Sequence, residues 1–447
     1  MVGETGTLDP ADPAVPMVGP PVAAAGPSLP EPARVAAPQV LASVRLVRLA
    51  ERAAAELDLA GVHPSAALGL SGRAVADIRA AVDGSTAAAT KAAYSSDWRR
   101  FTRWAGAGGF PPLPAPPLVV AHYVTAAAAE QTGVGRWRYA PATLTRWVST
   151  INQVHTAAGL DAPGRCEVVR RALSGIRRIR ATPPTRRAPL LLQDVRTLMV
   201  DLAGRAADWP AGVAARRDMA LLLMGFAGAH RRGELTALTL ADVTLHSTDG
   251  LHVRLRTSKT DQEARGAVKA LPYGRDPVTC PPCAYLRWRQ ILTAWDTAAD
   301  GAGRRAVLPV LRRQAADTGG GGAAEDDEDE PVLHCCRSTR LPEPADPARA
   351  VFPTVHKTGA VGARAMSGDA IAEMIQRRAA AAGFTAAQVD RLGGHSLRAG
   401  FVTEAFRAGA DAHAIMRQTG HRSPVMLEVY AREHAPLVGN AVTRLGL

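Results

Sequence analysis

Two short stretches near the C-terminal end of the chain hold cationic side chains in a regular arrangement: Gly394-His395-Ser396-Leu397-Arg398 and Gly420-His421-Arg422-Ser423-Pro424. Tyr430 follows His421 by nine residues. In the first stretch His395 and Arg398 are three residues apart, so a helix would bring both to one face. Taken singly, each stretch also suits a turn with a hydrogen-bonded imidazole, and Tyr430 suits a half-buried packing position.

Two stretches upstream add further cations. The segment His230-Arg231-Arg232-Gly233-Glu234-Leu235 directly follows the apolar residues 221–229. An arginine at the end of a buried helix is costly unless an anion or a glutamate pairs with it. Ser258-Lys259-Thr260-Asp261-Gln262 falls between an alternating stretch, 251–256, that predicts a strand and its expected hairpin partner, 266–271. A hairpin lysine is usually exposed, but its flexible stem can also reach a ligand.

In this order and spacing, the four stretches resemble the sequence boxes of the tyrosine recombinases, the phage integrase family. Arg231-x-x-Glu234-Leu235 is similar to the family's first arginine box, and Lys259 to its hairpin lysine. His395-x-x-Arg398 and Gly420-His421 with Tyr430 are similar to its closing boxes. The resemblance runs from about residue 85 to the end. It implies a mainly α fold, with a helical N-terminal core-binding domain and an α-rich catalytic domain containing a small antiparallel sheet or hairpin.

The resemblance also implies an enzyme, a site-specific DNA recombinase or integrase. Its expected catalytic residues are Arg231, Lys259, His395, Arg398, His421 and the nucleophile Tyr430. Arg231 is preferred to Arg232 because it lies three residues before Glu234, as in the family.

Elementary chemistry agrees with these roles. A phosphodiester repels a nucleophile, so its transition state needs fixed cations, and arginine supplies a permanently charged fork of donors. Attack by Tyr430 would give a 3′-phosphotyrosyl intermediate, with His395 assisting proton transfer at the tyrosine and Lys259 protonating the leaving 5′ oxygen. His421 is expected to donate to the phosphate. Because the covalent bond stores the phosphodiester energy, no ATP, metal or other cofactor is expected.

Two other functions fit the same residues. One is strand cleavage and resealing like that of a type IB topoisomerase, and the other is a non-catalytic DNA-binding protein of the same fold. For a recombinase, the resemblance implies double-stranded DNA recombination sites as partners, a homotetramer on DNA, and accessory directionality proteins.

The longest apolar stretch, 219–229, is shorter than the ~20 residues of a membrane span. Without a signal peptide at its start, the chain is expected in the cytoplasm, associated with the nucleoid, and not at a membrane.

The charge of the chain points to a polyanionic partner. Its 447 residues contain 53 Lys plus Arg against 41 Asp plus Glu, a net charge of +12. Residues 165–187 alone hold eight arginines and one acid. The arginines expected to bind DNA are Arg99, Arg100, Arg103, Arg146, Arg170, Arg171, Arg177, Arg178, Arg186 and Arg187.

Composition also divides the chain. Residues 1–70 are rich in Pro and Ala and predict a disordered leader. Residues 85–181 predict the helical core-binding domain, 182–189 a basic linker, and 190–447 the catalytic domain, with a disordered insertion at 301–349. In the first domain we expect helices from residue 85 and over 118–130, 142–158 and 167–180. The aromatic stripe Tyr94, Trp98, Phe101 and Trp104 would be core with Arg99, Arg100 and Arg103 exposed, and the last helix would bury Val168, Leu173 and Ile176.

The cysteines offer one further possibility. Cys280-Pro281-Pro282-Cys283 and His334-Cys335-Cys336 can be drawn as a zinc site. However, the second group borders the insertion expected to be disordered, and the first begins a helix. No metal is therefore expected.

Overall fold

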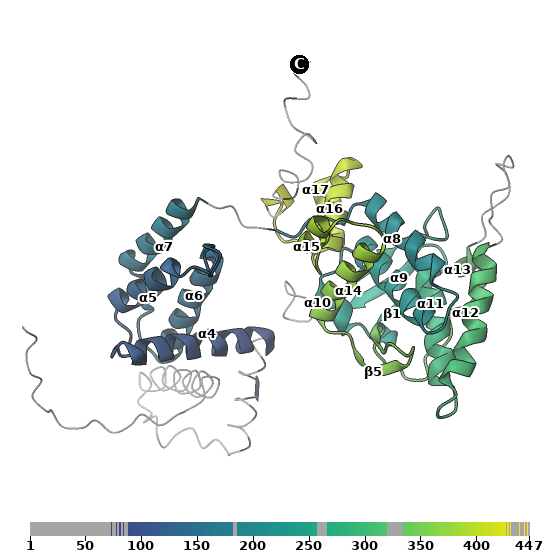
Figure 1. The fold of residues 1–447 in the computed structure, drawn as a ribbon, viewed down its shortest axis with the longest axis horizontal. Coiled ribbons are helices and arrows are strands. Elements are labelled where there is room, and N and C mark those ends of the chain that lie inside the picture. The colour runs from purple at the N-terminus through teal and green to yellow at the C-terminus, as the bar shows by residue number, and fades with distance from the viewer. Residues whose placement is uncertain are drawn as a thin grey trace, which may run out of the picture. The chain divides into compact units, whose positions relative to one another are not determined.

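A computed structural model of the chain describes residues 88–181, 186–256, 266–319 and 334–425, together with isolated positions before residue 88 and after residue 425 that include Tyr430. The chain divides into two compact units, residues 1–184 and 185–447 (Figure 1). The boundary falls within the expected linker, 182–189. The leader, 1–70, and Lys259 lie outside the described residues.

Within residues 88–181, the first unit contains four helices around an aromatic core. Aromatic rings of three helices interlock: Phe101 lies 5.1 Å from Tyr123, and Tyr123 lies 5.6 Å from Trp147, between ring centroids. Proline occupies the first turn of two of the helices, where its missing N–H costs no hydrogen bond. The helices are α4 (Ala88–Ala107), α5 (Pro117–Ala129), α6 (Pro141–Ala157) and α7 (Glu167–Arg180).

Two expectations for the first unit are wrong in detail. The buried residues of α7 are Val169, Leu173 and Ile176, whereas Val168 is exposed. At the start of α7, the residue that faces the core is therefore Val169 and not Val168. Arg100 is not on the exposed side but half-buried, with its guanidinium 4.4 Å from the ring centroid of Tyr139.

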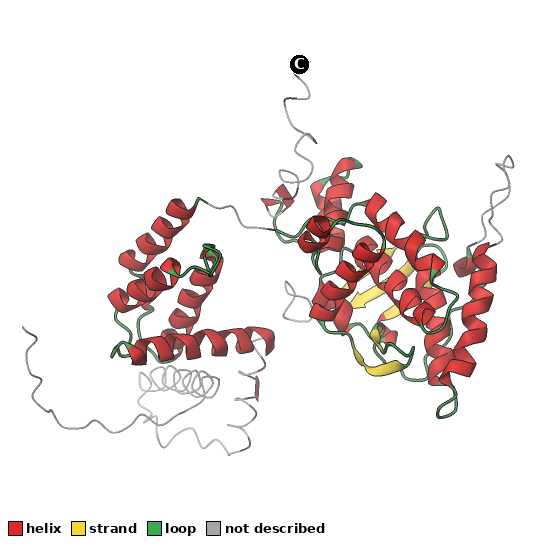
Figure 2. Cartoon of the chain, viewed as in Figure 1, coloured by secondary structure: helices red, strands yellow, loops and turns green. Residues whose placement is uncertain are grey.

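The second unit is a helical domain with two small antiparallel sheets (Figure 2). Its α-helices are α8 (Leu192–Gly204), α9 (Ala211–Ala227), α10 (Arg232–Ala237), α11 (Pro281–Asp296), α12 (Gly303–Gly319), α13 (Cys335–Ser338), α14 (Gly368–Ala381), α15 (Ala386–Arg391), α16 (Ser396–Arg407) and α17 (Ala412–Thr419). The strands are β1 (Val243–His246), β2 (Gly250–Leu255), β3 (Ala267–Leu271), β4 (Pro353–Val355) and β5 (Val361–Ala365). The mainly α fold class is therefore confirmed.

The larger sheet confirms the predicted hairpin. Strand β2 pairs with both β1 and β3, and Leu251 lies opposite Leu271 in the β2–β3 register. Alternate residues of β2 are buried because one face of the sheet packs against the core.

Helix α9 lies at the centre of the second unit and is almost entirely buried. It carries a charged residue at its middle, Asp218, which is fully buried and accepts hydrogen bonds from Arg217 and from Arg378 of α14. This paired carboxylate ties the two helices together.

Across the described residues, we find no helix with the length and apolar character that crossing a membrane requires.

The expected disorder over 301–349 is wrong for most of that range. Residues 303–319 form α12, and residues 334–349 are described as well. Helix α12 packs on α11 and buries Val307 and Leu311 in the main core. Apolar burial at this helical spacing outweighs Pro309, which lies inside the helix.

One close backbone approach fixes α16 against the start of the second unit. The amide of Leu190 donates to the carbonyl oxygen of Ser396 at 3.0 Å. A side chain added at Gly400 would collide with the carbonyl oxygen of Leu190. Glycine is therefore needed here for packing and not for its conformational freedom.

We predict that Gly400→Ala lowers the stability of the protein by about 2 kcal/mol, because backbone must move to admit the methyl group. Gly175→Ala in α7 is the matched control, since no atom lies within 4 Å of its added methyl group. That variant should be more stable than the parent by up to about 1 kcal/mol. Urea unfolding of both variants tests the prediction, and equal effects in the two would contradict it.

Candidate active site

The turn after α9 positions Arg231, the arginine of the first box. Ala229 adopts a left-handed conformation with φ 45°, which costs a non-glycine residue about 1 kcal/mol or more. The chain then reverses, so that Arg231 becomes the N-cap of α10. Its backbone amide donates to the Glu234 carboxylate at 3.0 Å, and its guanidinium donates to the same carboxylate at 2.7 Å. Glu234 therefore fixes both the backbone and the side chain of Arg231.

Glu234 is a buried anion shared by several cations. Besides Arg231, the Lys269 Nζ lies 3.4 Å and the His230 Nδ1 3.6 Å from its Oε2. Burial acts to raise the pKa of Glu234, but His230, Lys269 and Arg231 outweigh it and hold the pKa well below its usual range. The carboxylate is thus ionised at neutral pH.

Lys269 is a member of the site that the sequence analysis missed. It lies on β3, is 4% exposed, and donates to the carbonyl oxygen of Gly228 at 2.7 Å. Burial, opposed by Glu234, lowers the pKa of Lys269 to about 8. The alternation of side chains along β3 could have revealed Lys269, because it shares the inward face of the strand with Leu271.

Arg398 of α16 lies at the bottom of the site, fully buried. Its two terminal nitrogens donate to the carbonyl oxygen of Ala229 at 2.7 Å and to the His421 Nε2 at 2.9 Å. Burial and the nearby Arg231 lower the pKa of Arg398 to about 10, so the guanidinium still carries its charge at pH 7. The strained Ala229 turn and the H-x-x-R box are therefore joined by one hydrogen bond.

His421 follows Gly420, which ends α17 in the left-handed conformation that favours glycine. Burial and the cations Arg398 and Arg231 lower the pKa of His421 to about 4, so the ring is neutral at pH 7. Arginine has only donors, so the His421 Nε2 accepts and the ring proton lies on Nδ1, 3.0 Å from the Thr419 hydroxyl. In this arrangement His421 orients Arg398, whereas the sequence suggested a donor to phosphate.

Tyr430 meets the site through its hydroxyl. Its oxygen lies 2.6 Å from the Nε2 of His395, the N-cap residue of α16. Its ring is 8% exposed and packs in an apolar cluster with residues such as Val402 and Leu427. The ring of His421 lies 6.2 Å away, between centroids. Tyr430 is thus held by apolar contacts at its ring, with an imidazole at its reactive oxygen.

The structure brings together five of the six expected catalytic residues; the sixth, Lys259, lies outside the described part of the chain. Arg232 is directed elsewhere, because its guanidinium donates to the Asp369 carboxylate at 2.7 Å. Around Arg398, the neighbouring charged groups are Arg231, Lys269 and the single carboxylate of Glu234. The described cluster therefore holds two more positive charges than negative ones, which is unusual for buried groups without an anionic ligand.

The arginines expected to bind DNA have varied surroundings. Arg99, Arg103, Arg178 and Arg186 are exposed. Arg146 forms a two-fold ion pair with the buried Asp97, with both N–O distances 2.9 Å. The remaining members contact protein groups: Arg100 lies over Tyr139, Arg170 and Arg171 share Glu167, Arg177 donates to Thr145, and Arg187 donates to the backbone of Asp390.

Site and fold together define a class of protein, a phosphoryl-transfer enzyme with a tyrosine nucleophile. No protein-family profile matches the chain. Among curated proteins, the chain is 28% identical to an integrase/recombinase XerD homolog of Selenomonas ruminantium over 359 residues, which cover 80% of this chain and 85% of that protein. This similarity agrees with the resemblance of the boxes around the site to those of the tyrosine recombinases.

Solved structures of tyrosine recombinases are also similar to this chain. The Tn1549 transposon integrase in complex with transposon right end DNA is 14% identical, with a TM-score of 0.43, and the match covers 80% of this chain and 92% of that one. The XerA recombinase is 14% identical with a TM-score of 0.31, over 82% of this chain and 96% of that one. A lambda integrase dimer bound to a core site is 12% identical with a TM-score of 0.39, over 86% and 75%.

The buried imidazole of His230 predicts a loss of stability in mild acid. Burial lowers the pKa of His230 from 6.5 to about 4. Below pH 6.5 the unfolded chain binds a proton that the folded chain does not, so stability falls as the pH falls from 6.5 toward 4. From pH 7 to pH 5 this residue should cost about 2 kcal/mol. Unfolding free energies of wild type and His230→Asn at both pH values measure it.

The His230→Asn variant should lose about 2 kcal/mol of the wild-type dependence of stability on pH between pH 7 and pH 5. An unchanged dependence in His230→Asn would show that its imidazole is not buried in the neutral form.

Proposed function

We propose that this protein is a site-specific DNA recombinase or integrase that cleaves and rejoins DNA through a 3′-phosphotyrosyl intermediate. The observation that carries the proposal is the excess of two positive charges in the buried cluster of Arg231, Lys269, Arg398 and Glu234, close to the hydroxyl of Tyr430. A phosphodiester carries one negative charge, and its transition state concentrates further charge on the nonbridging oxygens. Such an anion is the partner that the cluster needs.

Each described residue then has a role that its position supports, and Lys259 keeps the role that the sequence resemblance implies. His395 accepts the phenolic proton of Tyr430 as the phenolate oxygen attacks phosphorus. Arg231 and Arg398 bind the nonbridging oxygens, with Glu234 and His421 holding their guanidinium groups in place. The P–O bond to the 5′ oxygen breaks, and Lys259 supplies the proton to that oxygen. Attack by the 5′ hydroxyl of another strand on the phosphotyrosine reverses these steps and exchanges partners.

Exposed arginines of the first unit suit binding along the DNA backbone. Those of α4 and α7 can contact phosphates without reading sequence, so affinity would fall steeply as salt concentration rises. A shallow hollow on α7 is lined by Arg170, Arg171 and Arg177. Assembly as a homotetramer on two recombination sites, accessory directionality proteins and a place at the nucleoid belong to the same proposal.

The nucleophile is tested by trapping it on DNA. With a recombination site nicked close to the cleavage position, the released fragment diffuses away and the covalent complex accumulates. We expect wild type to form this complex and Tyr430→Phe to form none, because the attacking oxygen is absent. Denaturing electrophoresis of labelled DNA measures the adduct, and peptide mapping locates the modified residue.

Tyr285→Phe is the matched control, because its buried hydroxyl lies in α11 and has no hydrogen-bond partner among the described residues. This variant should trap DNA as wild type does. An adduct in Tyr430→Phe would exclude Tyr430 as the nucleophile. An adduct that is only resealed, without exchange between two sites, would indicate the topoisomerase-like function, and DNA binding without any adduct in wild type would indicate the non-catalytic one.

The roles of Lys259 and Lys269 can be distinguished with a substrate whose leaving group needs no proton. A substrate with sulfur in place of the bridging 5′ oxygen releases a thiolate, which needs no proton. We expect Lys259→Met to slow cleavage of ordinary DNA by about 10²–10⁴-fold and to recover with the sulfur substrate. Lys269→Met should remain slow on both substrates, because Lys269 neutralises Glu234 and adds charge to the cluster. The opposite pattern would assign the acid role to Lys269.

A further inference from the structure

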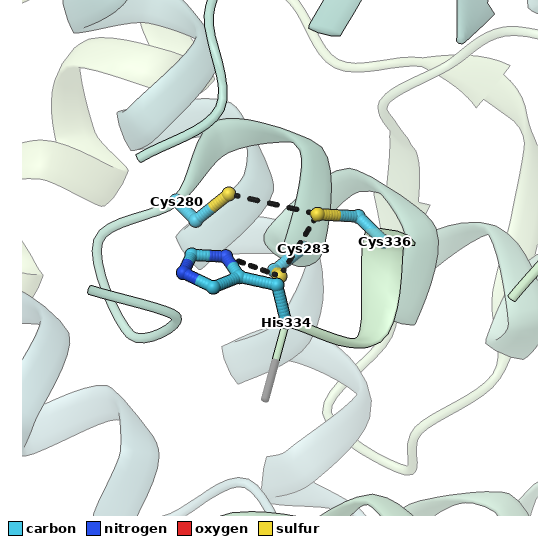
Figure 3. A group of neighbouring side chains, drawn as sticks. All are labelled: Cys280, Cys283, His334 and Cys336. Atoms are coloured by element: carbon cyan, nitrogen blue, oxygen red, sulfur yellow. Dashed lines mark hydrogen bonds between the residues drawn. The ribbon is translucent and has the colours of Figure 1, made fainter. Parts of the chain in front are cut away.

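A second cluster of reactive side chains lies apart from the residues that contact Tyr430. The start of α11 supplies Cys280 and Cys283, and the start of α13 supplies His334 and Cys336 (Figure 3). More than fifty residues separate the first cysteine from the last, yet their sulfurs share one small buried cluster. All four possible ligand atoms lie within 4.8 Å of one another.

Two of the three shortest distances between these atoms match the edges of a tetrahedron around one metal ion, and the Cys283–Cys336 distance is about 0.5 Å shorter. The Cys283 Sγ lies 3.3 Å and the Cys280 Sγ 3.8 Å from the Cys336 Sγ, and the His334 Nδ1 lies 3.5 Å from the Cys283 Sγ. With Zn–S bonds of about 2.3 Å and a Zn–N bond of about 2.0 Å, tetrahedral geometry requires S–S edges of about 3.8 Å and S–N edges of about 3.5 Å. A disulfide would need about 2.05 Å, and all these cysteines are free thiols.

Groups behind the ligand atoms orient them for a cation. The other ring nitrogen of His334, Nε2, lies 3.2 Å from the carbonyl oxygen of Arg275. Because a carbonyl only accepts, Nε2 carries the proton, and the lone pair of Nδ1 faces the sulfurs. The backbone amide of Gly274 donates to the Cys280 Sγ at 3.3 Å, as suits a thiolate. Metal-bound histidines and thiolates are usually supported in this way.

The surroundings indicate a structural ion and not a catalytic one. Cys280, Cys283 and Cys336 are buried, and Tyr273, Cys335 and Leu341 are partly buried hydrophobic residues that pack against them. Three cysteines and one histidine complete a tetrahedral shell, which leaves no position for a water or substrate. The expectation of no metal rested on disorder next to residue 334 and on the helix that begins at the first cysteine pair. Residue 334 is described at the start of α13, and the start of α11 places both cysteines of the pair in the cluster.

We propose that Cys280, Cys283, His334 and Cys336 bind one Zn²⁺ ion that joins the start of α11 to α13. Binding displaces the thiol protons to solvent and involves no change of oxidation state. The ion would close the segment 284–333, which contains α12, at its two ends. It would also hold α13 beside the larger sheet, where the guanidinium of Arg337 lies 3.4 Å from the ring centroid of Tyr273 and donates to the carbonyl oxygen of Ser247.

A second group of possible ligands, His246, Asp249 and His252, lies among exposed and half-exposed side chains. Its imidazoles already have partners: the His246 ring contacts the Thr248 hydroxyl, and the His252 ring contacts Asp249. This group therefore serves as the control for the proposed site.

The test is elemental analysis of the full chain, expressed with zinc in the medium and purified with a reductant and without a metal-affinity tag. We expect about one zinc per chain in wild type. The variants Cys283→Ser and Cys336→Ser should each retain at least fivefold less zinc, because a site with three ligands binds zinc far more weakly. Cys335→Ser, one residue from a proposed ligand, and His252→Asn should retain the wild-type amount.

A second measurement on wild type covers the case in which the cysteine variants fail to fold. After removal of zinc, added Co²⁺ should give the visible absorption bands of a tetrahedral cobalt–thiolate site. Three of the five thiols should react slowly with a thiol reagent in the zinc-loaded protein and quickly after chelation. Metal-free wild type that gives no cobalt bands would overturn the proposal. So would zinc retained in Cys283→Ser and Cys336→Ser, zinc lost in His252→Asn, or a disulfide between Cys283 and Cys336 in the reduced preparation.

Discussion

The ionised carboxylate of Glu234 is the interaction on which the active site depends. Among the described residues it is the one acid within a largely buried group of cations, and it contacts the backbone and the guanidinium of Arg231, the ammonium of Lys269 and the imidazole of His230. Breaking a buried pair by removing one partner costs about 3–5 kcal/mol. Without Glu234 the same cations would repel one another, so the carboxylate makes a permanently electropositive cluster compatible with a folded protein.

Backbone conformation and close packing position Arg398, as Glu234 positions Arg231. The left-handed turn at Ala229 points its carbonyl oxygen at Arg398, and Gly400 lets α16 approach Leu190 closely enough to place that arginine beneath the turn. His421 then holds the other side of the guanidinium. Arg398 is thus oriented before any ligand arrives, and preorganised donors of this kind stabilise developing charge without a cost in reorganisation.

The sequence predicted the features that depend on residues close together in the chain. It missed the features that depend on contacts between distant parts of the chain. The boxes around Arg231, Arg398 and Tyr430 are local patterns, and the β2–β3 hairpin follows from alternation along 251–256 and 266–271. Lys269 was missed because one inward lysine within a five-residue strand looks like an ordinary surface residue until its partners are known. Helix α12 was missed because the composition of 301–349 suggested a disordered insertion, although Val307 and Leu311 are at helical spacing. The cysteine cluster joins positions 280 and 336, a combination that the sequence offered as a possible zinc site but that the expected disorder over 301–349 argued against.

The active site and the cysteine cluster are connected along one short segment. Strand β3 carries Lys269 into the active site and ends at Leu271, opposite Leu251. Within a few residues the chain reaches Gly274 and Arg275, whose backbone groups support Cys280 and His334. A two-residue shift of β3 would keep its inward face but would move Lys269 away from Glu234 by about 7 Å. An ion bound just beyond the end of β3 would resist that shift, so the zinc site would act on catalysis by holding the register that places Lys269.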